Sequence, residues 1–140
     1  MVEFSKTYIT KDEHIDVQQI MDGLYYPFYM ESCRHDFIRE ILGFDFAVEA
    51  EKGVYMVLSQ FSIKFVRSLK KSDEFVVTCV LYRDATNQPK LHFMQTILLN
   101  KKIMTTGIFT GTCVPAAGGR PFLPLKIQLL LPDLPTLAID

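Results

Sequence analysis

The chain has 140 residues, of which 49% are hydrophobic and 22% charged, and this composition indicates one globular domain rather than a disordered segment. Its 15 basic and 16 acidic residues give a formal net charge of −1, so nothing in the composition favours nucleic acid as a partner. The N-terminus has no apolar signal segment, and no apolar run reaches the roughly 18 residues that a membrane span requires. We therefore expect a single cytoplasmic domain over residues 1–140, without membrane insertion.

The first convincing element, after weak alternation over residues 3–10 that predicts a strand, is a helix over residues 24–42. Proline is tolerated only in the first turn of a helix, so Pro27 predicts that this helix begins at about residues 23–26. Gly43 is a typical C-terminal stop. The apolar residues recur at helical spacing along one stripe, which consists of Tyr26, Met30, Cys33, Phe37 and Ile41.

Beyond the helix the apolar period changes to two, which is typical of strands. Further strands are predicted at about residues 73–83, 89–100 and 103–114, and several carry apolar residues on both faces. One helix cannot cover both faces, so we expect the second face to meet another subunit in a homodimer or homotetramer. The leucine- and proline-rich segment 122–140 is predicted to be an extended tail. An earlier strand, which directly follows the change of period, is predicted to have one face formed by Val57, Ser59, Phe61, Ile63 and Phe65.

One long helix followed by a meander of long antiparallel strands predicts an α+β fold, in which a curved sheet of about five strands wraps around the helix. The three cysteines, Cys33, Cys79 and Cys113, are odd in number and lie in apolar surroundings, which favours buried free thiols in a reducing compartment. No residues have the spacing of a metal site, a P-loop or a dinucleotide-binding glycine motif, so the sequence implies no cofactor.

The segment HIDVQQIMDGLYYPFYMESC (14–33) places Asp16 seven residues ahead of the glycine that opens the aromatic helix. It resembles the hotdog-fold acyl-CoA thioesterases of the 4-hydroxybenzoyl-CoA thioesterase type. In that family a catalytic Asp begins the pattern D-x-x-G-(V/I/H)-V-x-(Y/H/N)-x-x-Y, which ends inside the central helix. Asp16 falls on the catalytic Asp, and Gly23 falls on the helix-opening position. Tyr26 then matches the helix Tyr, and Glu31 matches an acidic residue common in the following turn.

Two later segments extend the resemblance over most of the chain. FVRSLKKSDEF (65–75) is similar to a strand-to-strand segment of the family, and CVPAAGGRPFLP (113–124) resembles its closing C-V-D-P-x-x-x-K-P-x-x-L-P. There are three departures. Gln19 stands where the family usually has Gly, Asp22 replaces Tyr, Phe or Asn, and His14 replaces an acidic residue.

The resemblance implies hydrolysis of an acyl thioester carried by coenzyme A or by an acyl carrier protein. Asp16 would act as nucleophile or as general base for water, and the residues leave this choice open. The first N–H groups of a helix are unpaired and carry partial positive charge, so the amides of Gly23 and Leu24 are candidates to polarise the carbonyl. One such donor contributes about 2.7–4 kcal/mol to transition-state stabilisation.

The substrate-binding candidates are Tyr26, Leu24, Glu31 and Lys70. Lys70 belongs to a basic set that could contact the coenzyme A phosphates, and this set consists of Lys64, Arg67, Lys70, Lys71, Lys101 and Lys102.

Each of these residues also has a purely structural interpretation. Asp16 has the sequence position of a turn or cap residue, and Asp22 that of an N-cap. Tyr26 suits the core, and Glu31 is spaced to pair with His35 along the helix. His14 is predicted to be an exposed turn residue.

Two other functions compete with hydrolysis. A hotdog dehydratase would need a His at the start of the helix, and no His opens this one. A non-catalytic module that binds acyl thioesters fits the same segment if Asp16 serves only the turn.

Overall fold

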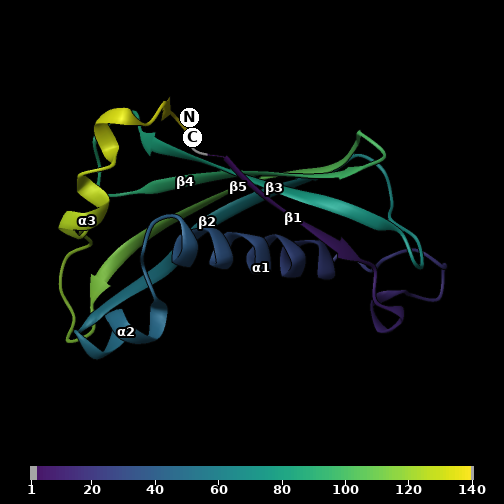
Figure 1. Cartoon of the computed structure of the whole chain (residues 1–140), viewed down its shortest axis with the longest axis horizontal. Helices are drawn as coiled ribbons and strands as arrows, with labels where there is room; N and C mark the ends of the chain where they lie inside the picture. The colour runs from purple at the N-terminus through teal and green to yellow at the C-terminus, as the bar shows by residue number, and fades with distance from the viewer. Residues whose placement is uncertain (1–2, 140) are drawn as a thin grey trace.

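The computed structural model describes residues 3–139, in which one long helix, α1 (Tyr25–Glu40), lies along one face of a curved sheet (Figure 1). The strands are β1 (Glu3–Ile9), β2 (Val54–Phe65), β3 (Glu74–Asp84), β4 (Leu91–Leu99), β5 (Lys102–Pro115) and the short β6 (Thr136–Leu137). The short helices are η1 (Asp12–His14), α2 (Phe46–Glu51), α3 (Leu125–Gln128) and η2 (Leu131–Asp133). The α+β prediction is confirmed.

The five long strands pair antiparallel in the order β1-β3-β4-β5-β2. Strand β6 pairs in parallel with the end of β3, beyond the reach of β1. In a single chain β2 is therefore an edge strand, and one side of its backbone has no strand beside it among residues 3–139. An edge of twelve residues is long enough to pair with a further strand.

Helix α1 begins two residues before Pro27, so the proline lies in its first turn as predicted. Four of the five predicted stripe residues are buried, but Ile41 is exposed and that part of the prediction is wrong. The helix ends at Glu40, and beyond its end the helical period no longer holds, so Leu42 turns into the core in place of Ile41. Gly43 follows with φ +68°, the left-handed conformation that glycine adopts without steric cost.

Strand β2 contains a β-bulge that its sequence pattern does not reveal. The pairing with β5 shifts by one residue between Leu58 and Gln60. The prediction that Val57 and Ser59 share a face with the residues beyond them is wrong, because the extra residue in the bulge changes the alternation. The side of β2 that pairs with the core-facing positions of β5 consists of Met56, Leu58, Phe61, Ile63 and Phe65.

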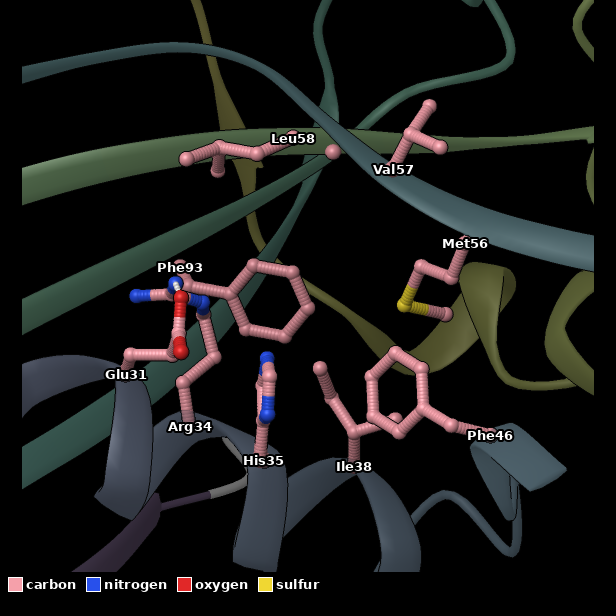
Figure 2. A pocket seen from close by; sticks show the side chains of 10 residues that line it. Glu31, Arg34, His35, Ile38, Phe46, Met56, Val57, Leu58 and Phe93 are labelled. Carbon is pink, nitrogen blue, oxygen red and sulfur yellow. Dashed lines mark ion pairs between the residues drawn. The ribbon is translucent and has the colours of Figure 1, made fainter.

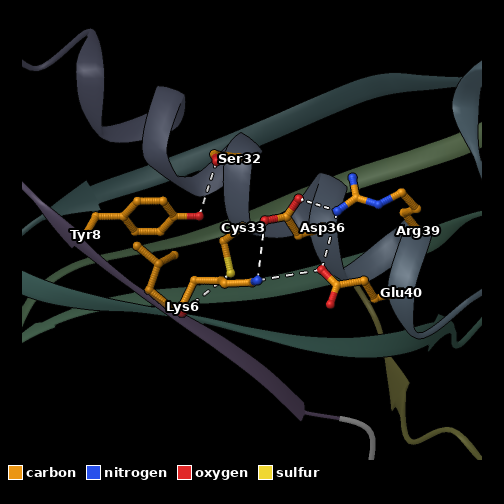
Figure 3. Close-up of polar contacts among 8 residues, drawn as sticks. Lys6, Tyr8, Ser32, Cys33, Asp36, Arg39 and Glu40 are labelled. Carbon is orange, nitrogen blue, oxygen red and sulfur yellow. Dashed lines mark hydrogen bonds and ion pairs between the residues drawn. The ribbon is translucent and has the colours of Figure 1, made fainter.

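Polar contacts fix the outer side of α1 against β1 (Figure 3). The Lys6 ammonium lies 3.7 Å from a carboxylate oxygen of Asp36 and 3.6 Å from one of Glu40. The Tyr8 hydroxyl donates to Ser32 Oγ over 3.2 Å. Exposed ion pairs stabilise by about 1 kcal/mol or less each, so they orient β1 more than they stabilise it.

All three cysteines are buried free thiols, as predicted. Burial raises the pKa of Cys33 to about 11 and that of Cys113 to about 12, and it also raises the pKa of Cys79. A thiol with such a pKa stays protonated near neutral pH and is a poor nucleophile.

The C-terminal segment is not the extended tail that was predicted. It forms α3, η2 and β6, and Ile127 of α3 is buried in the core. The Lys126 ammonium lies 3.2 Å from Glu49 Oε2 of α2, which ties the two short helices together. Tertiary contacts therefore fold a segment whose leucines and prolines give no clear period. No helix within residues 3–139 is long and apolar enough to cross a membrane.

A buried polar cluster closes the turn between β3 and β4. The His92 ring is fully buried, with Nε2 2.9 Å from Asp84 Oδ1 and Nδ1 2.9 Å from the Thr110 hydroxyl. Asp84 also accepts hydrogen bonds from Thr86 and Gln88. Burial by itself would raise the pKa of Asp84, but these hydrogen bonds outweigh it and lower the pKa to about 2. Each polar group is satisfied, so the cluster stabilises the turn.

We expect Asp84→Asn to lower the free energy of unfolding by about 1–3 kcal/mol near pH 7. The folded-state pKa is depressed, so the carboxylate stabilises the fold above its unfolded-state pKa of about 4 and loses this contribution as the pH falls towards 2. Urea titrations should therefore show a gap between wild type and variant that closes between about pH 4 and pH 2. Asp133→Asn, at an exposed carboxylate, is the control, and a gap that persists unchanged at pH 2 contradicts this account.

Candidate active site

The segment between β1 and α1 is a compact loop closed by backbone hydrogen bonds. Ile15 and Met21 form an antiparallel bridge, and the Asp22 N–H donates to the His14 carbonyl oxygen over 2.9 Å. A closed loop of this kind holds its side chains in fixed positions. The segment that resembles the thioesterase pattern therefore leads into α1 with a defined geometry.

The same loop is docked on the chain that follows β2. The Met21 N–H donates to the Leu69 carbonyl oxygen over 2.8 Å, and Ile20 forms a bridge with Lys70. Tyr26 is buried, and its hydroxyl accepts the Leu69 N–H over 2.9 Å. Tyr26 thus anchors the docked segment, while the exposed Lys70 is brought beside the loop.

Asp16 is partly exposed within this loop and has a structural role there. Its Oδ1 accepts the Gln18 N–H over 2.7 Å, and its own N–H donates to the Ile20 carbonyl oxygen over 2.8 Å. Among residues 3–139 no donor reaches its second carboxylate oxygen. The turn therefore orients the carboxylate and leaves one oxygen available to a ligand or to water.

Gln19 has φ +68°, which is the left-handed conformation that side chains rarely adopt. Its N–H donates to the Asp16 carbonyl oxygen over 3.0 Å, so this conformation closes the turn around Asp16. Gln19 stands at the position where the resemblance places glycine. Gln19 thus adopts a conformation that glycine would reach without steric cost.

The start of α1 presents one free amide rather than the two that were predicted. The Leu24 N–H donates to Asp22 Oδ1 over 2.9 Å, so Asp22 caps the entry to the helix and occupies that amide. No group among residues 3–139 accepts a hydrogen bond from the Gly23 N–H. Gly23 is exposed, and its amide is the one left to bind a carbonyl oxygen.

Asp16 and Gly23 both lie near Tyr26. The Tyr26 ring packs edge-on against Phe65 with a centroid distance of 5.1 Å, and the Gly23 backbone lies against the tip of the Phe65 ring. Burial raises the pKa of Tyr26, and the negative charges of Asp73 and Asp16 nearby raise it further. The carboxylate and the free amide therefore both lie in the neighbourhood of Tyr26, at the start of α1.

This surface is unusually apolar for one exposed to water. Leu24 is 78% exposed and Val17 is 95% exposed, and both flank the loop. Large apolar side chains are also exposed on both sides of the edge strand. Leu58, Phe61 and Phe65 lie on the side towards α1, Tyr55 and Val57 lie on the other side, and Val66 follows the strand. Monomeric proteins rarely leave so many large apolar side chains in water along one strand.

His14 is buried, contrary to the prediction of an exposed turn residue. Its ring stacks on Tyr25 with a centroid distance of 3.8 Å, and Nδ1 lies 2.8 Å from the Tyr29 hydroxyl. The Lys11 N–H donates to the same hydroxyl over 3.1 Å. His14 therefore belongs to an aromatic cluster that packs the loop against Tyr25 and Tyr29 of α1.

Two of the predicted basic residues have partners within the chain. The Lys71 ammonium lies 3.9 Å from Asp12 Oδ2, and Arg67 Nη1 donates to the Ile103 carbonyl oxygen over 2.8 Å. Both contacts lie on exposed surface and contribute little to stability. Of the basic set, Lys70 is the residue whose backbone is paired with the loop that carries Asp16.

Glu31 lies away from the loop, at the rim of a cavity of about 290 Å³ between α1, α2 and β2 (Figure 2). Its carboxylate lies 4.0 Å from Arg34 Nη2, so its ion-pair partner is Arg34 rather than His35. The Met56 side chain points into the cavity and that of Val57 points away from it. Sequence reasoning missed this cavity, because its lining residues come from five separate elements. They are Glu31, Arg34, His35, Ile38, Phe46, Met56, Val57, Leu58, Phe93 and Gly111.

No protein-family model and no curated protein matches the sequence. The fold, in contrast, is shared with solved structures over nearly the whole chain. A hypothetical protein from Aquifex aeolicus is 20% identical, with a TM-score of 0.81 over 91% of this chain and 98% of its own. A DHNA-CoA thioesterase from Staphylococcus aureus is 16% identical, with a TM-score of 0.80 over 100% of both chains.

A 1,4-dihydroxy-2-naphthoyl-CoA thioesterase from Synechocystis is 13% identical, with a TM-score of 0.80 over 95% of this chain and 98% of its own. The chain has the hotdog fold. This confirms the predicted fold, whose sheet order and central helix are shared with proteins named as thioesterases.

The conformation of Gln19 leads to a stability prediction. We expect Gln19→Gly to raise the free energy of unfolding by about 0.5–1 kcal/mol, because relief of the left-handed strain exceeds the added entropy of the unfolded chain. Gln18→Gly, at the adjacent exposed residue without a positive φ, is the matched control and should be destabilising. Chemical denaturation of both variants measures the difference, and equal destabilisation by the two substitutions is the result that contradicts it.

Proposed function

We propose that the protein is a thioester hydrolase that cleaves an acyl group from coenzyme A or from the phosphopantetheine arm of an acyl carrier protein. The observation that carries the proposal is a half-free carboxylate, Asp16, in the same closed loop that leads to the free Gly23 amide at the start of α1. The hotdog fold, which the chain shares with proteins named as thioesterases, supports the same reaction class.

The chemistry needs charge stabilisation where the thioester oxygen becomes negative. In the proposed site the Gly23 N–H, aided by the partial positive charge of the α1 N-terminus, binds the carbonyl oxygen. Leu24 contributes its side chain to the surface beside the thioester, since Asp22 occupies its amide. Tyr26 acts by holding the loop and the Leu69 segment together, because its hydroxyl is already engaged.

The Asp16 carboxylate supplies the second half of the reaction. It either adds to the carbonyl carbon and releases the thiolate, leaving an acyl-enzyme that water hydrolyses, or takes a proton from the water that adds directly. Both routes consume one water and give a carboxylic acid and a thiol. The exposed Lys70, whose backbone is bridged to the loop, is proposed to contact the phosphates of the carrier.

Replacement of the Asp16 carboxylate separates a catalytic role from a turn role. Asn at this position still offers a side-chain oxygen to the Gln18 N–H, so Asp16→Asn should keep the turn and lose the negative charge. We expect hydrolysis of an acyl-CoA panel, followed with a thiol reagent, to fall by about 10²-fold or more. Glu13→Gln, at an exposed carboxylate of the same loop, is the control and should retain activity. Unchanged activity in Asp16→Asn would reject hydrolysis by Asp16 and favour the acyl-thioester-binding module.

We also propose that the active form is a homodimer built by antiparallel pairing of two β2 edges. The proposal is supported by the unpaired edge and by the large apolar side chains exposed along β2. Such pairing brings the Phe65 end of one β2 beside the Val54 end of its partner. The candidate site of each protomer then lies at the seam between the two chains.

Charge at the seam tests the dimer. We expect Val57→Lys to weaken dimerisation at least about tenfold, because each protomer then places a charged side chain in the seam between the paired edges. Val48→Lys is the matched control, since Val48 is similarly exposed but lies on α2, away from the β2 edge. Sedimentation equilibrium gives the masses, and a wild-type monomer, or a dimer equally stable in both variants, would contradict β2 pairing.

A further inference from the structure

The cavity between α1, α2 and β2 contains a positive charge that its surroundings do not neutralise. Arg34 is 4% exposed, and within residues 3–139 its one ion-pair partner is Glu31, at 4.0 Å from Nη2. The Glu31 side chain is itself 58% exposed, so this contact is weak. A buried guanidinium without a close carboxylate is costly to the fold, and such charges are normally paired.

Neutral contacts hold the Arg34 side chain in place without neutralising it. Nη1 donates to Gln95 Oε1 over 2.9 Å, and Gln95 in turn donates to the Met30 carbonyl oxygen over 2.8 Å. The guanidinium carbon lies 4.3 Å from the centre of the Phe109 ring. The head group is therefore preorganised, with an orientation set by residues that carry no charge.

The rest of the cavity lining is apolar or neutral. Ile38, Phe46, Met56 and Phe93 form its walls, and the His35 ring rises between them (Figure 2). Burial lowers the pKa of His35, which keeps the ring uncharged near neutral pH. A narrow apolar space with one buried cation at its side suits a short chain that ends in an anionic oxygen.

Pairing of two β2 edges would bring this cavity towards the catalytic loop of the partner. The cavity is lined by residues 56–58, near the start of β2, whereas Tyr26 and the Gly23 backbone pack on Phe65 at its end. Antiparallel pairing places the start of one strand beside the end of the other. An acyl group held at the α1 N-terminus of one protomer is then directed towards the Arg34 cavity of the other.

We propose that Arg34 is a specificity-determining residue and that the preferred substrates are thioesters of dicarboxylic acids, whose free carboxylate pairs with the Arg34 guanidinium. This inference rests on the proposed hydrolase function and goes beyond it by naming the acyl class. Glu31 at the rim works against an anionic acyl group, and its exposed side chain can move aside as the ligand carboxylate takes the position next to Arg34.

The test compares two acyl groups of equal length, adipoyl-CoA with a terminal carboxylate and hexanoyl-CoA with a terminal methyl. We expect wild type to have the higher kcat/KM for adipoyl-CoA. Arg34→Met should lower the adipoyl-to-hexanoyl ratio at least about 30-fold, because it leaves the ligand carboxylate without its buried partner. Arg39→Met is the matched control, since Arg39 lies on the same helix with an exposed side chain paired to Asp36, and it should leave the ratio unchanged.

Glu31→Gln keeps the proposal testable if Arg34→Met fails to fold. Glu31 is exposed, and removal of its charge should raise the adipoyl-to-hexanoyl ratio a few-fold, because it no longer competes for the guanidinium. A wild-type preference for hexanoyl-CoA, or a ratio that neither substitution changes, overturns the assignment of Arg34.

Calorimetric binding of free adipate separates failure of this inference from failure of the proposed function. If no thioester is hydrolysed but adipate binds wild type and not Arg34→Met, the hydrolase proposal fails and the anion site stands. If acyl-CoA hydrolysis depends on Asp16 but adipate neither binds nor is favoured as its thioester, the hydrolase proposal stands and the Arg34 site is rejected.

Discussion

The close packing of α1 on the concave face of the sheet is the contact on which the rest of the molecule depends. At Gly107 of β5 a side chain would begin 2.9 Å from the Phe109 ring and 3.4 Å from the Met30 methyl of α1, so glycine at this position permits the approach. This packing sets where the helix begins, and therefore where its free Gly23 amide lies. The same packing leaves a cavity that is bordered by α1, α2 and the start of β2, whose side chains do not fill it.

Two buried polar networks illustrate opposite uses of the same low-dielectric interior. Asp84, His92 and Thr110 satisfy one another, so burial strengthens their hydrogen bonds and the network stabilises a turn. Arg34 and Gln95 are hydrogen-bonded but keep an uncompensated charge. An interior that holds a cation without its counter-charge is incomplete by itself, which is why the cavity is interpreted through a ligand and the turn cluster is not.

The edge strand connects the structural and functional proposals. Large apolar side chains are exposed along β2, and Leu24 and Val17 are exposed in the segment that carries Asp16. A surface that covered these side chains would also enclose the candidate site and exclude water from it, which strengthens the interaction of the Gly23 amide with a developing negative charge. Dimerisation and catalysis would then depend on the same surface.

The sequence by itself predicted the elements whose patterns are local. Most of the helical stripe of α1, its start near Pro27, the positions of the long strands and the buried cysteines follow from spacing and side-chain type. The order of these elements indicated an α+β fold with a sheet around the helix, and the resemblance identified it as the hotdog fold. The resemblance of one short segment also singled out Asp16 and Gly23. These features can be read from sequence because they depend on neighbours within one or two turns of the chain.

Only the tertiary structure decided the features that depend on distant contacts. The bulge in β2 arises from its register with β5, the burial of His14 from the rings of Tyr25 and Tyr29, and the folding of the C-terminal segment from α2 and β3. The capture of the Leu24 amide by Asp22 and the isolation of Arg34 likewise depend on where side chains meet in space. Periodicity fixes which face a residue presents along its own element, but it carries no information on what that face will contact.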